Sequence, residues 1–201
     1  MSREPKNRAV REPSLAASNE DLALAWLREF ETSKAFAALA APVQKSLAGA
    51  VRVMAYSFTR RWSRANETAY PLNEMTADDA TDLLTEQLPR RVASIDAEVI
   101  IDGLIEFLVW ATKTHKIQNR EVEYACRKSR HDAVAAMRNE QKWAPGKAIV
   151  LHALQDGVDA TDLDRIRAHA MGRGLAPTFV DEFLPPGPTF LGNGRWLWQN
   201  E

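Results

Sequence analysis

The chain has 201 residues and a formal net charge of −1, with 26 basic and 27 acidic side chains. A chain of this length can bury a sizeable core without disulfides or metal, so we expect one domain with appendages. The near-zero net charge argues against a general attraction to nucleic acid or membrane. A single cysteine excludes an internal disulfide and an all-cysteine zinc site.

The N-terminal segment, residues 1–17, mixes charges of both signs with prolines. This composition predicts a disordered tail, and a basic arm for nucleic acid is the alternative. The segment lacks the apolar stretch of a secretory signal, and no stretch of the chain has the roughly 20 apolar residues of a membrane span. We therefore expect a cytoplasmic protein with no membrane contact.

Two amphipathic helices are predicted over residues 18–41 and 42–65. In the second helix apolar residues recur every three or four positions from Val43 to Trp62, and the opposite side is basic. The basic residues are Lys45, Arg52, Arg60 and Arg64. This side is either a solvated face or a binding surface for phosphate or an acidic partner, since arginine suits bidentate contacts with oxyanions.

A short helix is predicted from the capping residue Thr76 to Leu88, ending before Pro89 because proline disfavours helical backbone in the residue ahead of it. The next helix, from Ser94 to His115, is apolar over most of its circumference. That pattern is typical of a helix surrounded by other helices. We expect Ser94 to be its N-cap.

Three carboxylates follow one another at four-residue spacing along this central helix: Glu98, Asp102 and Glu106. They share one face. The stripe is either a solvated seam or a carboxylate-lined groove for a metal or for acid–base chemistry. No histidine follows a glutamate at the Glu-x-x-His spacing of di-iron bundles, so we reject a di-iron site.

A long helix is predicted after Asn119, and it carries a second basic cluster around Arg127 and Arg130. Cys126 falls on its apolar side, where a thiol packs as a small hydrophobe. A further helix is predicted to end at Gly157, a natural left-handed residue. The aspartates that follow lack the spacing of a calcium loop and predict a corner between helices.

The last segment, residues 176–201, changes character. After a proline-rich stretch, an Asn-Gly turn predicts a minimal hairpin. Its aromatic residues Phe190, Trp196 and Trp198 must pack on something, because a lone hairpin is marginal in water. They contact either the helical body or a partner, since tryptophan is enriched at binding hot spots.

Three motifs carry a resemblance: Leu88–Arg91, Trp143–Ala148 and Gly157–Asp162. The region that they span resembles the helical part of uncharacterised bacterial proteins that often carry a SEC-C zinc motif. The cysteine ligands of that motif are absent here. The resemblance implies a bacterial helical protein and no activity.

The sequence therefore predicts an all-α fold, an irregular multi-helix bundle around a buried central helix with a C-terminal extended arm or small hairpin. The predicted divisions are a tail over 1–17, a helical domain over 18–175 and an arm over 176–201. We expect a non-enzymatic interaction or adaptor module that binds another protein or a second copy of itself. A nucleic-acid-associated factor and an enzyme with an unrecognised site remain alternatives. No catalytic residue, metal or cofactor is predicted.

Overall fold

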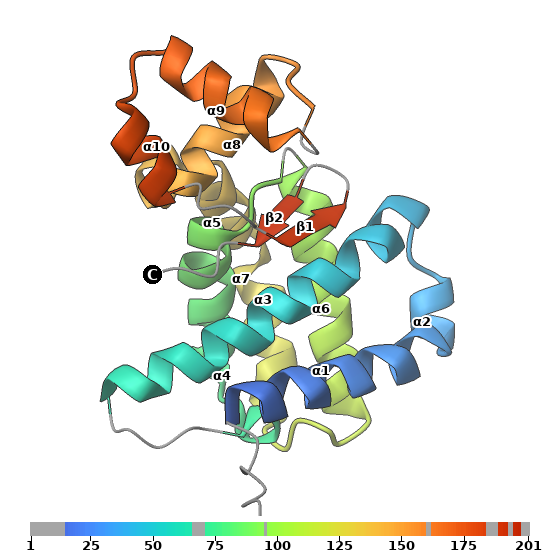
Figure 1. Ribbon diagram of the computed structural model, residues 1–201. Helices are drawn as coiled ribbons and strands as arrows, with labels where there is room; N and C mark the ends of the chain where they lie inside the picture. Colours follow the sequence, from blue (N-terminus) through green and yellow to red (C-terminus); the bar gives the residue numbers. More distant parts are fainter. Residues whose placement is uncertain are drawn as a thin grey trace, which may run out of the picture.

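The computed structural model describes residues 15–65, 71–94, 96–159, 162–183, 189–192 and 195–197, and within these ranges the side chains of residues 15–18, 46, 56, 57, 59–65, 181–183, 189–192 and 195–197 lie outside the description. The predicted all-α fold is confirmed (Figure 1). The main helices are α1 (Leu15–Glu31), α2 (Lys34–Ala37), α3 (Ala41–Ala65), α4 (Ala77–Asp82), α5 (Leu88–Arg91), α6 (Ala97–Lys113), α7 (Glu121–Arg138), α8 (Pro145–Gln155), α9 (Leu163–Gly172) and α10 (Pro177–Phe183).

The centre of the bundle is α6, as its composition predicts. It packs against α3 and α7, and its apolar residues from Ile100 to Ala111 are buried except for the half-buried Trp110. The predicted cap is wrong by two residues. Asp96 is the N-cap and accepts a hydrogen bond from the backbone N–H of Val99, whereas the Ser94 hydroxyl accepts one from the N–H of Asp96.

The helix α3 crosses close to α6 at Gly103. A Cβ atom added there would lie 2.9 Å from Cγ1 of Val43. On the same side of α6, Phe30 of α1 stands edge-on to Phe107, with ring centroids 5.7 Å apart. The small residue therefore lets α3 approach, and α1 closes the core beside it.

The helix that follows Thr76 does not stop at Leu88, so this prediction is wrong. The capping box of Thr76 with Asp79 is present, but a π-helical segment η2 (Leu83–Gln87) leads directly into α5, which contains Pro89. Proline has no N–H to bond the carbonyl four residues back. The carbonyl of Thr85 accepts a hydrogen bond from Nζ of Lys142 at 3.1 Å instead.

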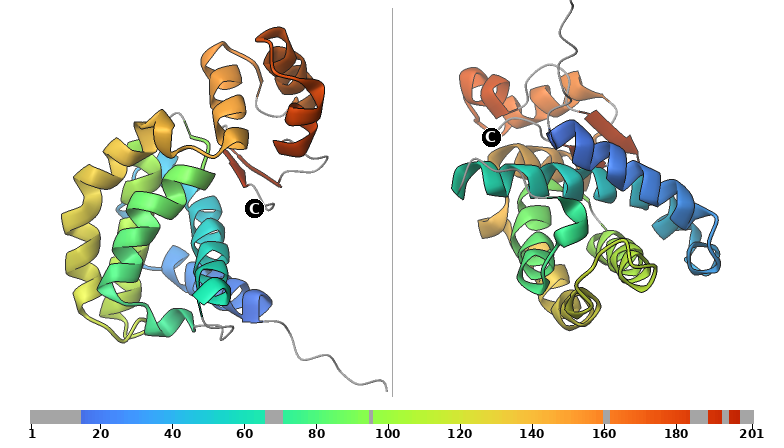
Figure 2. Two further views of the ribbon diagram at one scale, coloured as in Figure 1. Left: turned by 90° about the vertical axis from the view of Figure 1, so that its left-hand side faces the viewer. Right: turned by 90° about the horizontal axis from the view of Figure 1, so that it is seen from below.

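The last three helices, α8, α9 and α10, form a small unit at one end of the bundle (Figure 2). They enclose a second apolar cluster, which includes Ile149, Ile166 and Val180 and is separate from the main core. The left-handed Gly157 follows α8 as predicted, and Gly174 plays the same part after α9. Since α10 is helical, the predicted arm over 176–201 is wrong in its first residues.

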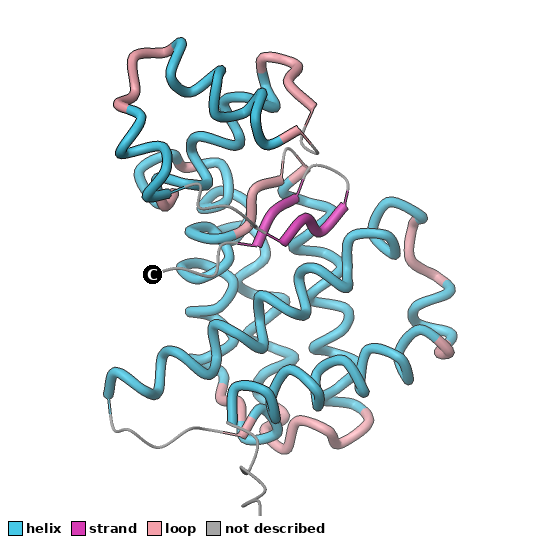
Figure 3. The backbone as a smooth tube through the Cα atoms, in the orientation of Figure 1, coloured by secondary structure: helices cyan, strands magenta, loops and turns pink. Residues whose placement is uncertain are grey.

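The predicted hairpin is present as the antiparallel strands β1 (Thr189–Gly192) and β2 (Arg195–Leu197), drawn in magenta in Figure 3. Its backbone lies against α3. The side chains of Phe190 and Trp196, and all of Trp198, lie outside the described residues. Their proposed contact with a partner stays a prediction.

At the N-terminal end, α1 begins at Leu15, ahead of the predicted start at residue 18. Residues 1–14 of the predicted tail lie outside the description. Among the described residues, no helix is both long enough and apolar enough to cross a bilayer.

Candidate functional site

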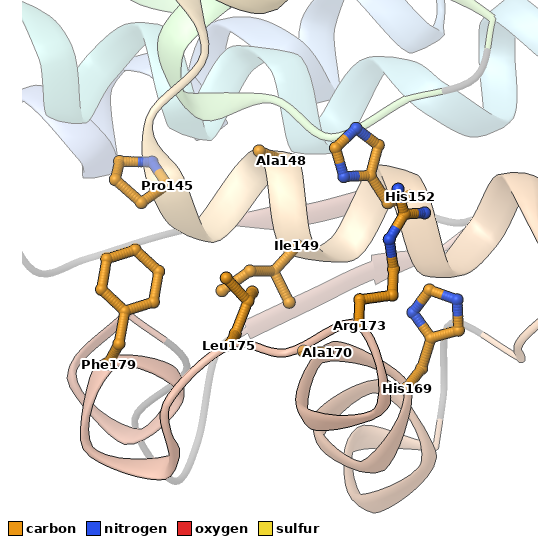
Figure 4. Close-up of a pocket in the computed structure, with 9 residues that line it drawn as sticks. All are labelled: Pro145, Ala148, Ile149, His152, His169, Ala170, Arg173, Leu175 and Phe179. Carbon is orange, nitrogen blue, oxygen red and sulfur yellow. The ribbon is translucent and has the colours of Figure 1, made fainter.

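A cleft of about 330 Å³ opens between α8, α9 and α10 (Figure 4). It is lined by Pro145, Ala148, Ile149, His152, His169, Ala170, Arg173, Leu175 and Phe179. Its volume lies at the lower end of the range for small-ligand pockets. It is the strongest candidate for a binding site in the described part of the chain.

The wall from α8 follows directly from helical geometry. Pro145, Ala148, Ile149 and His152 are spaced i, i+3, i+4 and i+7, so they form one face of the helix. Opposite them, α9 and the residue after it supply His169, Ala170 and Arg173. The chain then turns at Gly174, whose φ is +87°, and this turn brings Leu175 and Phe179 back to the cleft.

The cleft has two chemically different ends. Figure 4 shows Pro145 and Phe179 at one end of the cleft, Ile149 and Leu175 midway along it, and His152, His169 and Arg173 together at the other end. We call these the apolar end and the basic end. An occupant that fits both must be apolar along part of its length and polar at one tip.

Asp156 organises the basic end. Its Oδ2 lies 2.8 Å from Nε2 of His169 and 3.3 Å from Nη1 of Arg173. The hydrogen bond from His169 and the positive charge of Arg173 lower the pKa of Asp156. The carboxylate therefore stays ionised and accepts both hydrogen bonds.

The second ring nitrogen of His169, Nδ1, is buried and has no hydrogen-bond partner in the described part of the chain. Because Nε2 donates to Asp156, Nδ1 is an acceptor in the neutral ring and a donor once the ring is protonated. His152 is more loosely held, with Nε2 3.9 Å from Oε1 of Glu140. The imidazole of His152 can therefore offer a hydrogen bond to an occupant, whereas Nδ1 of His169 is enclosed by the protein.

The sequence alone does not indicate this site. Four histidines are scattered along the chain, and only the tertiary structure brings His152 and His169 to one cleft. The spacing of Pro145, Ala148, Ile149 and His152 was the available signal. It indicated a helix face, but nothing in the sequence placed α9 opposite that face.

The basic residues predicted on α3 lie elsewhere. Lys45 is exposed and Arg52 is partly exposed, with its Nε 4.0 Å from Oε1 of Glu20. The side chains of Arg60 and Arg64 lie outside the described residues. Lys45 and Arg52 do not line the α8–α10 cleft.

Arg127 and Arg130 face the carboxylates of α6. Arg130 makes a bidentate contact with Asp102 at 2.6 and 2.8 Å, and Nη1 of Arg127 lies 3.3 Å from Oε1 of Glu106. Arg138 and Glu98 continue the row at 2.9 Å. The carboxylate stripe and the second basic cluster, read from the sequence as two surfaces, form one ion ladder between α6 and α7.

Two potential nucleophiles are buried away from the cleft lining. Burial raises the pKa of Cys126 to about 12, so its thiol is protonated. Lys147 is fully buried, and burial lowers its pKa to about 7. Its Nζ donates to the carbonyls of Pro89 at 2.6 Å and Met137 at 3.3 Å.

Metal-ligating residues do not gather in the described part of the chain. No group of three or more histidine, cysteine, aspartate or glutamate side chains there could hold a metal ion.

Comparison with known proteins adds no relative. No protein-family model, curated protein or solved structure matches the chain. The resemblance to the helical part of proteins with a SEC-C motif therefore stays a prediction, and the cleft has to be interpreted from its own chemistry.

Proposed function

We propose that the protein is a non-enzymatic interaction module, and that the α8–α10 cleft is where it holds a partner. The observation that carries this proposal is the cleft itself, whose apolar end is open to solvent. Leu175 and Phe179, which line it, are 36% and 37% exposed. Large apolar side chains gathered at an opening are typical of surfaces that bind another molecule.

The condition of the potential nucleophiles supports binding over catalysis. Cys126 is protonated and buried, and Lys147 is enclosed by the ends of two helices. At the basic end, His169 and Arg173 are hydrogen-bonded to Asp156. These side chains stabilise one another, and a polar group of the bound partner can contact them.

A nucleic-acid-associated role draws less support from the same contacts. Arg127 and Arg130 are paired with carboxylates of their own chain, so they offer little free positive charge to phosphate. As part of the same proposal, we place the protein in the bacterial cytoplasm, which the buried free thiol of Cys126 suits.

Differential capture tests the proposal. Wild type, Ala148→Phe and Ala168→Phe serve as baits in extracts of cells that express the protein, with quantitative mass spectrometry as the readout. Ala148 lines the cleft, so phenylalanine there fills it, whereas Ala168 is exposed on α9 and outside the lining. We expect a protein that wild type and Ala168→Phe retain and Ala148→Phe loses. The same set on all three baits refutes the cleft as the docking site.

A further inference from the structure

We propose that the junction between α8 and the main bundle is a pH-sensitive clasp. Protonation of the Lys147 amine releases the α8–α10 unit from the ends of α5 and α7, and loss of that proton holds the unit closed. This inference goes beyond the proposed function. It concerns how the unit that contains the cleft is attached, whether or not the cleft binds a partner.

The clasp is formed by two side chains at the start of α8, which contact the ends of two helices. The indole Nε1 of Trp143 donates to the carbonyl of Met137 at 2.8 Å. Nζ of Lys147 donates to the same carbonyl at 3.3 Å and to the carbonyl of Pro89 at 2.6 Å. Both carbonyls lie in the last turn of a helix, where the helix itself supplies no donor. The start of α8 therefore supplies donors to both helix ends.

Apolar packing attaches the unit less firmly than it holds the bundle together. The apolar cluster of the unit is separate from the main core, and Ala93 joins it from the side of the bundle. Next to this contact a second cleft, of about 320 Å³, lies between Ala97 and Met137 of the bundle and Leu151 and Gln155 of α8. Because little apolar surface is buried here, the hydrogen bonds of the clasp carry much of the attachment.

The contacts of Lys147 suit a neutral amine better than an ammonium. A neutral amine has two N–H donors, and two carbonyls accept hydrogen bonds from the fully buried Nζ. An ammonium has a third donor, for which the described part of the chain provides no oxygen acceptor. The further contact of Nζ is with the ring of Trp143, whose centroid lies 5.0 Å away. Proton uptake therefore places a charge in a dry junction, which is costly.

The charged groups around the clasp do not neutralise this charge. Those on the surrounding elements, including η3 (Glu140–Lys142), are Arg90 and Arg91 of α5, Arg138 of α7, Glu140 and Lys142 of η3, Glu98 of α6, Glu86 of η2 and His152 of α8. Glu98 and Glu86 bind Arg138 and Lys142, and Glu140 lies near His152. Lys147 makes no ion pair with any carboxylate in the described ranges, and burial lowers its pKa to about 7.

The proton balance gives the direction of the response. In the closed state the pKa of Lys147 is about 7, and in the open state, where water reaches the amine, it returns to the ordinary value of 10.5. Between these values the open state binds more protons, so lowering the pH by one unit favours opening by about tenfold. Below pH 7 both states hold the proton, and the response levels off.

Thiol labelling of the full chain tests the clasp. Ala93→Cys places a thiol in the buried contact between the bundle and the unit, where an alkylating reagent reaches it when the unit opens. Ala168→Cys places a thiol on the exposed side of α9, and its labelling rate at the same pH corrects for thiol ionisation. We call the ratio of the second rate to the first the protection of position 93. The native Cys126 lies in the main core and reports opening of the bundle.

We expect position 93 to react at least about tenfold faster than Cys126, because the smaller cluster opens at lower free energy. Its protection should rise by about tenfold from pH 7 to 8.5 and change by only about twofold between pH 6 and 7.

A pair of lysine variants assigns this response to the clasp. With Lys147→Met, protection should vary by less than about twofold over the same range, since the titrating group is gone. The matched control Lys142→Met removes a neighbouring lysine that binds Glu86, and it should keep the wild-type response. If Lys147→Met does not fold, the wild-type and Lys142→Met profiles still decide the test.

Two results overturn the inference. Equal labelling of position 93 and Cys126 at every pH means that the unit and the bundle open together, so that no separate clasp exists. Protection that stays constant between pH 7 and 8.5, or that rises equally with Lys147→Met, means that Lys147 does not control the opening.

Discussion

At the scale of single residues, Lys147 has the largest structural consequence. Its side chain is fully buried, its Nζ lies 5.0 Å from the centroid of the Trp143 ring, and it donates to carbonyls in the last turns of α5 and α7. Trp143 donates to the same Met137 carbonyl at 2.8 Å. One amine therefore fastens the start of α8 to the ends of two helices of the main bundle.

The lowered pKa of Lys147 should make the free energy of unfolding depend on pH. Burial lowers the pKa of the folded amine to about 7 from its ordinary 10.5. Between these values the unfolded chain binds more protons, so stability rises with pH; below pH 7 both states hold the proton, and the cost of the buried charge is complete. From about pH 7 to 9.5, wild type should gain on the order of 2–3 kcal/mol relative to Lys147→Met.

Urea unfolding at several pH values measures this difference. Lys147→Met keeps the apolar stem but removes the titrating group, so groups elsewhere contribute equally to both proteins. Parallel stability curves for the two proteins across this interval would mean that Lys147 stays charged in the folded state.

At the scale of helices, close approach and ion pairing decide how α6 meets its neighbours. Gly103 is unfavourable in a helix taken alone, by about 1 kcal/mol relative to alanine. Glycine is nevertheless favoured at position 103 because α3 packs closely there, and Val43 leaves no room for a Cβ. On the other side, α7 is aligned by the contacts of Arg127, Arg130 and Arg138. These pairs are partly exposed, so each contributes less than about 1 kcal/mol.

Replacing Gly103 with alanine should therefore destabilise the protein, despite the better helix propensity of alanine. We expect a loss of about 1–2 kcal/mol in urea unfolding, the usual cost of overpacking a stiff β-branched neighbour. Gly172→Ala is the matched control, since a Cβ there meets nothing within 4 Å. It should be neutral or slightly stabilising. If Gly103→Ala is as stable as this control, α3 shifts freely on α6.

At the scale of the whole molecule, the two apolar clusters differ greatly in size. The main cluster joins helices from α1 to α7, whereas the second is confined to Ala93 and the α8–α10 unit. Burial of apolar surface is the principal stabilising term, so the smaller cluster holds its helices less firmly. A binding cleft in such a unit can adjust to an occupant without disturbing the bundle.

Hydrogen exchange should distinguish the stability of the α8–α10 unit from that of the main bundle. We expect amides of α9 and α10 to exchange through openings of lower free energy than amides of α6, because local stability follows buried apolar contact. Lys147→Met should increase exchange in α8 more than in α6. Uniform protection across α6, α9 and α10 would show that the chain opens as one cooperative unit.

Much of the helical architecture was determined by the sequence alone. The apolar circumference of residues 100–111, the three-to-four periodicity of α3, the capping of Thr76 and the pairing of the two hairpin strands each reflect a local preference, and the structure follows them. Local rules failed where a distant group intervened. The helix continues through Pro89, and Lys142, far along the chain, donates to the carbonyl of Thr85, four residues before this proline.

The candidate site was decided by tertiary structure. Periodicity assigns residues to helix faces but does not state which faces meet, so it separated the carboxylates of α6 from the arginines of α7 that bind them. For the same reason, the sequence does not show that His152 and His169 lie in one cleft. They meet there because the chain turns at Gly157 and Gly174, and α9 and α10 pack back onto α8. The sequence determined which surfaces each helix has, and packing between helices distant in sequence determined which of them form a cleft.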